Sequence, residues 1–130
     1  MMRGKIRNRN IAKQLKDFSG LRFGKITPTD VDGLLEFNDK LYIIIEVKYG
    51  DASMPYGQQL AFQRGCDAWQ SEKRNAYIIV AHHRTPEEQD IDVASQVVGS
   101  IYHKKQWDRP RIGMTVRQAI EEIRALHGVA

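Results

Sequence analysis

The sequence contains one cysteine and no long apolar run, and each shortage excludes a class of protein. The single Cys66 rules out a disulfide within the chain and is typical of proteins from a reducing compartment. The longest apolar run, residues 41–45, is far shorter than the roughly 20 residues that a membrane-spanning helix needs. The charged residues 1–10 are followed by no apolar segment of the kind that a secretory signal requires. We therefore expect a cytoplasmic protein with no membrane partner.

Proline is also scarce, and the chain has neither a low-complexity segment nor an internal repeat. The four prolines accompany a composition that is ordinary for a globular protein, with 42% hydrophobic and 28% charged residues. A chain of 130 residues is long enough to bury a real core. We expect one domain over residues 1–130, in which residues 1–8 form a basic arm that could be flexible.

Acidic residues are nearly absent from the first part of the chain. Residues 1–29 hold eight basic side chains and one acidic side chain, whereas the rest of the chain holds twelve basic and fifteen acidic ones. Lysine and arginine bind polyanions by neutralising phosphates and releasing counterions, so a nucleic-acid partner is one interpretation. A solvated terminus that aids solubility is the other. The side chains that we expect to contact DNA are Arg3, Lys5, Arg7, Arg9 and Lys13.

The spacing of the apolar residues predicts a mixed α/β domain in three layers. A capping box at Thr115 and Gln118 marks the start of the last helix, which ends near Gly128. The expected helices are 9–18, 55–70, 115–128 and, as one interpretation of a weaker pattern, 85–98. The expected strands are 21–26, 31–37, 41–49, 75–83 and, at an edge of the sheet, 99–107.

The two strands 31–37 and 41–49 form a hairpin whose register is set by its hydrophobic pattern. A two-residue turn would mix apolar and charged side chains on both faces. A three-residue turn, 38–40, instead pairs Phe37 with Leu41 and places Asp32 opposite Glu46. One face of the hairpin is then free of polar side chains, and the other carries the ionisable ones. The residues of that second face are Asp30, Asp32, Leu34, Glu36, Tyr42, Ile44, Glu46 and Lys48.

This pairing brings two carboxylates to one point of the hairpin. Cross-strand β-carbons lie about 4.5–5.5 Å apart, so Asp32 and Glu46 could share one divalent cation. Lys48 lies two residues beyond Glu46 on the same face, where it could orient water or offset charge on a phosphate. The alternative is a solvent-facing hairpin with charges paired across the strands, such as Asp30 with Lys48.

The order Asp32, thirteen residues, then Glu46-Val47-Lys48 resembles the signature of the PD-(D/E)XK nuclease superfamily. The following helix with "YGQQLAF" and the strand with "AYIIVAH" are similar to the later part of that family's core. The resemblance covers roughly residues 10–83 and is greatest to small phage-encoded members and to archaeal-type Holliday junction resolvases. It implies a restriction-endonuclease-like αβββαβ core with a mixed central sheet, here followed by a C-terminal helix. It also raises the option of a phage-encoded protein acting in the host cytoplasm.

The resemblance implies a role for each residue of the motif. Asp32 and Glu46 would bind Mg²⁺ or Mn²⁺, the main-chain carbonyl of Val47 would add a ligand, and Lys48 would be the catalytic lysine. Gln58 resembles a glutamine that some branches carry on the next helix, with Gln59 as the fallback for that role.

The sequence also departs from the family pattern. No proline directly precedes Asp32, and the first helix offers Gln14 and Asp17 where many relatives have a glutamate. These departures leave the number of metal ions open. Asp30 could substitute for Asp32 if the turn differs from the one expected.

We therefore predict a Mg²⁺- or Mn²⁺-dependent DNA endonuclease with structure preference or low sequence specificity. A catalytically silent nucleic-acid-binding module of the same fold and an end-dependent exonuclease are the alternatives. A homodimer that presents two active sites to two strands is a further option. Trp107 is interpreted as a packing residue, with base stacking beside Lys105 and Arg109 as an alternative.

Overall fold

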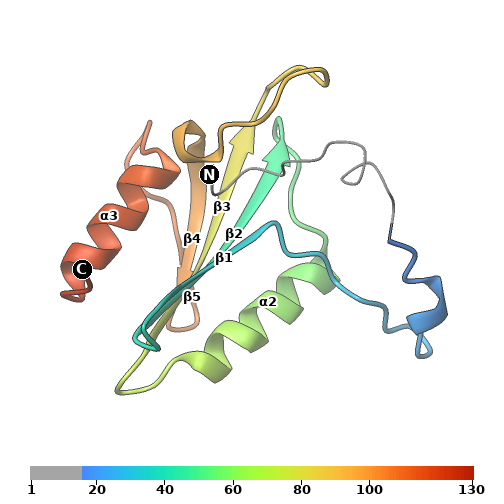
Figure 1. Cartoon of the computed structure of the whole chain (residues 1–130), viewed down its shortest axis with the longest axis horizontal. Helices are drawn as coiled ribbons and strands as arrows, with labels where there is room; N and C mark the ends of the chain where they lie inside the picture. Colours follow the sequence, from blue (N-terminus) through green and yellow to red (C-terminus); the bar gives the residue numbers. More distant parts are fainter. Residues whose placement is uncertain (1–15) are drawn as a thin grey trace, which may run out of the picture.

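Five strands form one mixed sheet at the centre of the protein, and their order in the sheet follows the chain (Figure 1). The structure is a computed structural model that describes residues 16–130. Strands β2 and β3 are parallel, and every other neighbouring pair is antiparallel. The strands are β1 (Gly33–Phe37), β2 (Leu41–Tyr49), β3 (Asn75–His83), β4 (Val97–His103) and β5 (Gln106–Asp108).

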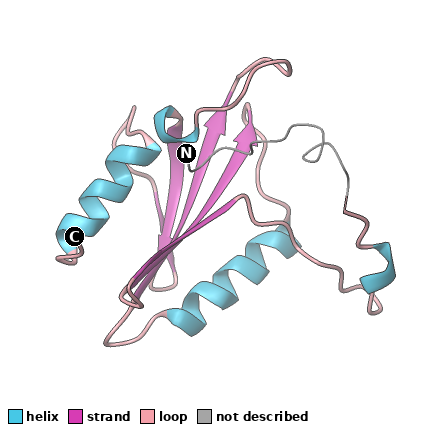
Figure 2. Cartoon of the chain, viewed as in Figure 1, coloured by secondary structure: helices cyan, strands magenta, loops and turns pink. Residues whose placement is uncertain are grey.

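The two α-helices cover opposite faces of this sheet, so the layers are helix, sheet and helix (Figure 2). Helix α2 (Tyr56–Trp69) connects the parallel strands β2 and β3, as a crossover between parallel strands requires. Helix α3 (Val116–Leu126) begins with the expected capping box: the Thr115 hydroxyl accepts from the Gln118 N–H, and the Gln118 side chain accepts from the Thr115 N–H. Two short 3₁₀ helices, η1 (Ser19–Leu21) and η2 (Val93–Ser95), lie in the connections. None of the helices within residues 16–130 has the length and apolar character to cross a bilayer.

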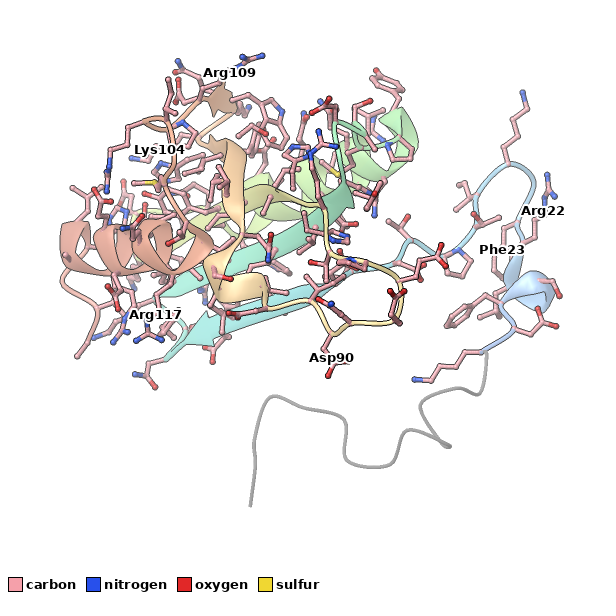
Figure 3. The ribbon with its side chains drawn as sticks, turned by 90° about the horizontal axis from the view of Figure 1, so that it is seen from above. Arg22, Phe23, Asp90, Lys104, Arg109 and Arg117 are labelled. Carbon is pink, nitrogen blue, oxygen red and sulfur yellow. The ribbon has the colours of Figure 1, made fainter. Side chains whose placement is uncertain are left out.

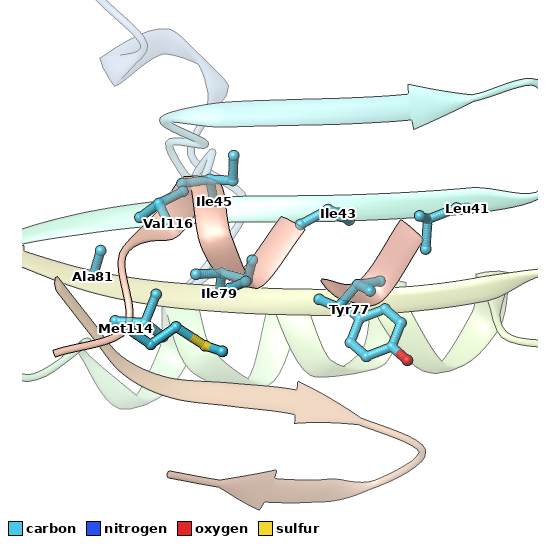
Figure 4. Close-up of a cluster of buried hydrophobic side chains, with 11 residues drawn as sticks. Leu41, Ile43, Ile45, Tyr77, Ile79, Ala81, Met114 and Val116 are labelled. Atoms are coloured by element: carbon cyan, nitrogen blue, oxygen red, sulfur yellow. The ribbon is translucent and has the colours of Figure 1, made fainter. Parts of the chain in front are cut away.

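The odd-numbered side chains of β2 and β3 form the larger core with α3. Ile43 and Ile79 are fully buried there and pack against Val116 and Ala119 of the helix (Figure 4). The even-numbered side chains pack against α2 in a second core. Its buried members are Ile44, Phe62, Cys66, Ala76, Ile78, Val80 and Tyr102.

The hairpin has the register that its hydrophobic pattern predicts. Phe37 pairs with Leu41 and Gly33 pairs with Ile45, so the three-residue turn is confirmed. Asn38 and Asp39 have φ angles of 52° and 60° in that turn, a left-handed conformation that asparagine and aspartate tolerate better than most residues. Strand β1 begins at Gly33, two residues later than expected.

Three expectations about the remaining elements are wrong. Residues 21–26 form a tight turn with a single bridge between Phe23 and Ile26, because Gly24 takes a φ of 64° that a strand cannot hold. Residues 85–98 are loop, η2 and the start of β4 instead of a helix. The backbone of Val98 and Gln96 bonds to the segment 114–116, and this tertiary pairing overrides the weak helical spacing.

The expected strand 99–107 is in fact a hairpin. It turns at Lys104 and Lys105, both at positive φ, and the short β5 forms the sheet edge. The expected helix 9–18 lies mostly outside the described residues, and its last three residues, 16–18, are not helical.

The segment before β1 projects away from the body of the protein. Arg22 and Phe23 lie at a distance from the sheet and its helices (Figure 3). Several apolar side chains of this segment are exposed, including Phe23 at 69% and Ile26 at 71%. The segment then returns along the N-terminal half of α2 and enters β1.

Candidate functional site

The ionisable residues of the hairpin face a groove between the sheet and the first turns of α2. Asp32 lies directly before β1, Glu46 and Lys48 lie on β2, and Gln58 lies in the first turn of α2. The groove has a volume of about 720 Å³, and the segment 25–30 forms its outer wall. Its lining residues are Lys25, Ile26, Thr27, Pro28, Thr29, Asp30, Asp32, Glu46, Lys48, Pro55, Gly57, Gln58, Leu60, Ala61 and Arg64.

Glu46 is the only charged side chain among the buried residues of the described chain, with 3% of its surface exposed. Burial raises the pKa of its carboxyl group, the ion pair with Lys48 acts in the opposite direction, and the nearby Asp32 charge raises it again. One carboxylate oxygen, Oε1, lies 3.1 Å from Lys48 Nζ. The other, Oε2, is buried and has no hydrogen-bond partner in the described protein. A buried carboxylate oxygen without a partner needs a cation or a donor beside it.

Asp32 extends the pairing of the hairpin one residue beyond the end of β1. Its Oδ2 accepts a hydrogen bond of 2.8 Å from the backbone N–H of Val47, the residue after Glu46. This bond fixes the exposed Asp32 carboxylate next to the buried Glu46 carboxylate, as the hairpin register predicts. The Val47 side chain packs toward α3 on the opposite face, so only the backbone of this residue can take part in the site.

Lys48 is held by two partners in the groove. Its Nζ lies 3.1 Å from Glu46 Oε1 and donates to Gln58 Oε1 at 3.0 Å. The Gln58 amide in turn donates to the main-chain carbonyl of Asp30 at 3.1 Å. Gln58 therefore links strand β2, helix α2 and the outer wall of the groove.

Gln58 and its fallback Gln59 point in different directions, and Gln58 is the one that reaches Lys48. Gln59 donates to Gln63 on the other flank of α2 and lines a different cavity. Asp30 contributes its carbonyl, and its carboxylate is not needed to complete the pairing. The structure thus brings together Asp32, Glu46, Lys48 and Gln58, with the Val47 backbone among them.

The donor set fits a hard divalent cation such as Mg²⁺ or Mn²⁺. Within residues 16–130, no three His, Cys, Asp or Glu side chains lie close enough to hold an ion by themselves. Mg²⁺ commonly binds through one or two carboxylates and takes its other ligands from water and substrate phosphates. The adjacent carboxylates of Asp32 and Glu46, with the unpartnered Oε2, provide that arrangement.

Two basic residues of the groove were not found from the sequence. Arg64 lies on α2 three residues after Ala61, which also lines the groove, and this i, i+3 spacing is a signal that would have placed the two side by side. Lys25 reaches the groove because the segment before β1 folds back along α2. No local sequence pattern predicts the path of this segment. The predicted DNA contacts Arg3, Lys5, Arg7, Arg9 and Lys13 lie outside the described residues.

Similarity to known proteins gives no independent indication of what this site does. The chain has no match among protein-family models, curated proteins or solved structures.

Proposed function

We propose that the protein is a metal-dependent deoxyribonuclease of the PD-(D/E)XK type, acting as an endonuclease on DNA phosphodiester bonds. The observation that carries this proposal is the buried Glu46 carboxylate, with Asp32 beside it and Lys48 bonded to it. A fold gains nothing in stability from burying a carboxylate next to a second one. The arrangement is accounted for by a cation that binds both.

The order of the elements supports a restriction-endonuclease-like core. The hairpin β1–β2, the crossover helix α2 and the parallel strand β3 supply the last four elements of the αβββαβ pattern. The turn at 23–26 stands where the pattern has its first strand. The proposed core therefore rests on the hairpin β1–β2, helix α2 and strand β3, which carry the residues of the motif.

Each residue of the site has a chemical role in this proposal. Asp32 and Glu46 would hold the cation, which would polarise the phosphodiester and promote ionisation of the attacking water. Lys48, paired with Glu46, would offset the negative charge that develops on the phosphate. Gln58 fixes the position of the Lys48 ammonium group through its hydrogen bond, so less reorganisation is needed during the reaction.

The groove offers basic side chains to a phosphate backbone. Lys25, Lys48 and Arg64 line it together with the acidic residues Asp30, Asp32 and Glu46, so a cation bound at the carboxylates would make it net positive. Contacts of lysine and arginine with phosphates position a nucleic acid without reading its sequence. We accordingly expect preference for DNA structure over recognition of a defined sequence.

The test compares wild type with Glu46→Ala on supercoiled, linear, flapped, branched and single-stranded DNA in Mg²⁺ or Mn²⁺. We expect wild type to cut and Glu46→Ala to bind DNA without cutting. Glu72→Gln is the matched control, because it removes one carboxylate at the opposite end of the sheet and should cut normally.

The outcomes separate the alternatives. Equal cutting by wild type and Glu46→Ala would refute the assignment of Glu46. Salt-sensitive binding without cutting by wild type would favour a binding module, and cutting of linear but not circular DNA would favour an exonuclease.

A further inference from the structure

A second cavity lies on the other flank of the first turn of α2. The consecutive residues Gln58 and Gln59 direct their side chains to different sides, Gln58 into the groove of the carboxylates and Gln59 into this cavity. Lys48 and His82 are register partners on the parallel strands β2 and β3, so the two sites are built on neighbouring strands, whose backbones lie about 4.8 Å apart. The cavity has a volume of about 560 Å³ and is lined by Asp51, Ala52, Ser53, Met54, Gln59, Val80, His82, Gly99, Ser100, Trp107 and Arg109.

The floor of this cavity is formed at an irregularity of the sheet. The pairing of β3 with β4 shifts between Val80 and Ala81, which leaves Gly99 as the extra residue of a β-bulge. A side chain at Gly99 would collide with His82, because an added Cβ would lie 2.6 Å from the imidazole Nε2. The glycine therefore makes room for the histidine in the cavity lining. His82 Nδ1 is buried and has no hydrogen-bond partner among the described residues.

One wall of the cavity is the indole ring of Trp107. Its Nε1 donates to Gln63 of α2 at 2.8 Å, and the ring packs against Tyr102 at 5.1 Å between centroids. The only polar atom of the side chain is thus already used, and the ring offers an apolar aromatic surface to the cavity. Met54 adds a flexible apolar side chain to the lining.

Arg109 supplies a positive charge at the mouth of the cavity. It follows β5, is exposed and projects from the surface (Figure 3). Within residues 16–130 it has no hydrogen-bond or ion-pair partner, whereas the acidic Asp51 of the same lining is paired with Arg84 at 3.3 Å. The guanidinium is therefore available to an anionic ligand.

We infer that this cavity receives one unpaired nucleobase of the DNA strand whose phosphate lies at Asp32 and Glu46. The inference rests on the proposed nuclease function and names its substrate class. An aromatic wall suits a base plane, Gln59 and Ser100 suit the polar edge of a base, and Arg109 suits the adjoining phosphate. A base in a duplex is paired and stacked, so the cavity selects DNA that is single-stranded, frayed or branched next to the cleavage point.

The experiment measures binding without divalent cations, so it does not depend on catalysis. A labelled DNA with one duplex-to-single-strand junction, which fixes the register of binding, carries one abasic site that is moved along the single strand one position at a time. For wild type we expect one position at which the missing base weakens binding about 5- to 100-fold, the range expected for one stacked base. Ser100→Leu, which narrows the cavity and replaces a polar lining side chain with an apolar one, should reduce this dependence on position.

Two further variants control for charge and folding. Arg109→Gln should weaken binding more than Lys105→Gln, which removes the same charge from the β4–β5 turn outside the cavity lining. In a Trp69→Phe background Trp107 is the sole tryptophan, and its fluorescence should be quenched by the intact oligonucleotide. This second readout keeps the test decisive if Ser100→Leu does not fold.

The outcomes distinguish the two proposals. Cutting of DNA by wild type with no position-dependent effect and no quenching would overturn the nucleobase site and leave the nuclease assignment intact. A position-dependent effect with quenching would support the site even if the protein did not cut.

Discussion

The two faces of the sheet differ in what their side chains do. Toward α3, the central side chains of β2 and β3 are apolar and fully enclosed, and they form the larger core. Toward α2, the apolar core is interrupted at the carboxyl ends of the same strands by Glu46, Lys48 and His82. One face of this fold therefore serves stability, whereas the other has two polar cavities where apolar side chains could have packed. Such local departures from a consistent core are typical of functional sites.

The largest effect that separates the two faces is expected for Glu46→Gln. The amide keeps the shape of the side chain but removes the negative charge that would bind a cation. We expect plasmid cleavage to fall about 1000-fold, the loss seen when a principal electrostatic group of an active site is removed. The midpoint of thermal unfolding should change little, because loss of the buried and repelled charge offsets loss of the ion pair with Lys48. A variant that cuts at the wild-type rate, or that unfolds much earlier, would contradict the assignment of Glu46 to a functional site.

The opposite result is expected for a change on the α3 face. Ile79→Ala removes a fully buried side chain from the larger core and should lower the free energy of unfolding by about 3 kcal/mol. Urea unfolding monitored by circular dichroism measures this change, with Ile79→Val as the milder control at about 1 kcal/mol. Under conditions where the Ala variant is still folded, it should retain its DNA cleavage. Loss of cleavage by the folded variant would show that the α3 face also contributes to the site.

A polar cluster at the margin of the α3 face provides a pH-dependent test. His103 stacks on Tyr77 at 3.9 Å between centroids and contacts Asn75 at 3.2 Å, and His127 is bonded to both Tyr77 and Asn75. Burial lowers the pKa of His103 from 6.5 to about 4, and the neighbouring positive charge of Lys104 acts in the same direction. The pKa of His127 is lowered for the same two reasons.

Because the folded state binds these protons less readily than the unfolded state, the free energy of unfolding should decrease as the pH falls from 6.5 to about 4. Thermal unfolding at a series of pH values measures this dependence. His103→Gln should have a shallower dependence over that range, and an unchanged slope would contradict the assignment to His103.

The smallest effect on DNA binding is expected for the basic residues Lys25 and Arg64, which line the groove on the α2 face. Arg64→Gln removes an exposed positive charge from the groove of the carboxylates. It should weaken DNA binding by a few-fold across all sequences and reduce the slope of log affinity against log salt by about 1. Arg117→Gln on α3 is the matched control, because it removes a charge from the other side of the sheet and should leave the slope unchanged. Equal effects of the two variants on DNA binding would show that DNA does not bind preferentially to the α2 face.

The hairpin and its facing carboxylates could be predicted from the sequence because the information is local. Apolar alternation allows one register for β1 and β2, and this register determines that Asp32 lies next to Glu46. Strand β3 and the capping box of α3 carry equally local signals.

The remaining features depend on contacts between distant segments. Lys25 reaches the groove through the path of an irregular segment, and the second cavity depends on a bulge at Gly99 that apolar spacing does not encode. The segment 85–98 illustrates the same limit, since its end pairs with residues 114–116 that no local pattern connects to it.

The hydrogen bond from the Val47 N–H to Asp32 has a mechanical consequence. Asp32 is the last residue of the projecting segment before the sheet begins at Gly33, so one side chain both supplies a carboxylate of the site and, with the Gln58–Asp30 bond, tethers that segment. A displacement of the segment would therefore move the Asp32 carboxylate relative to Glu46.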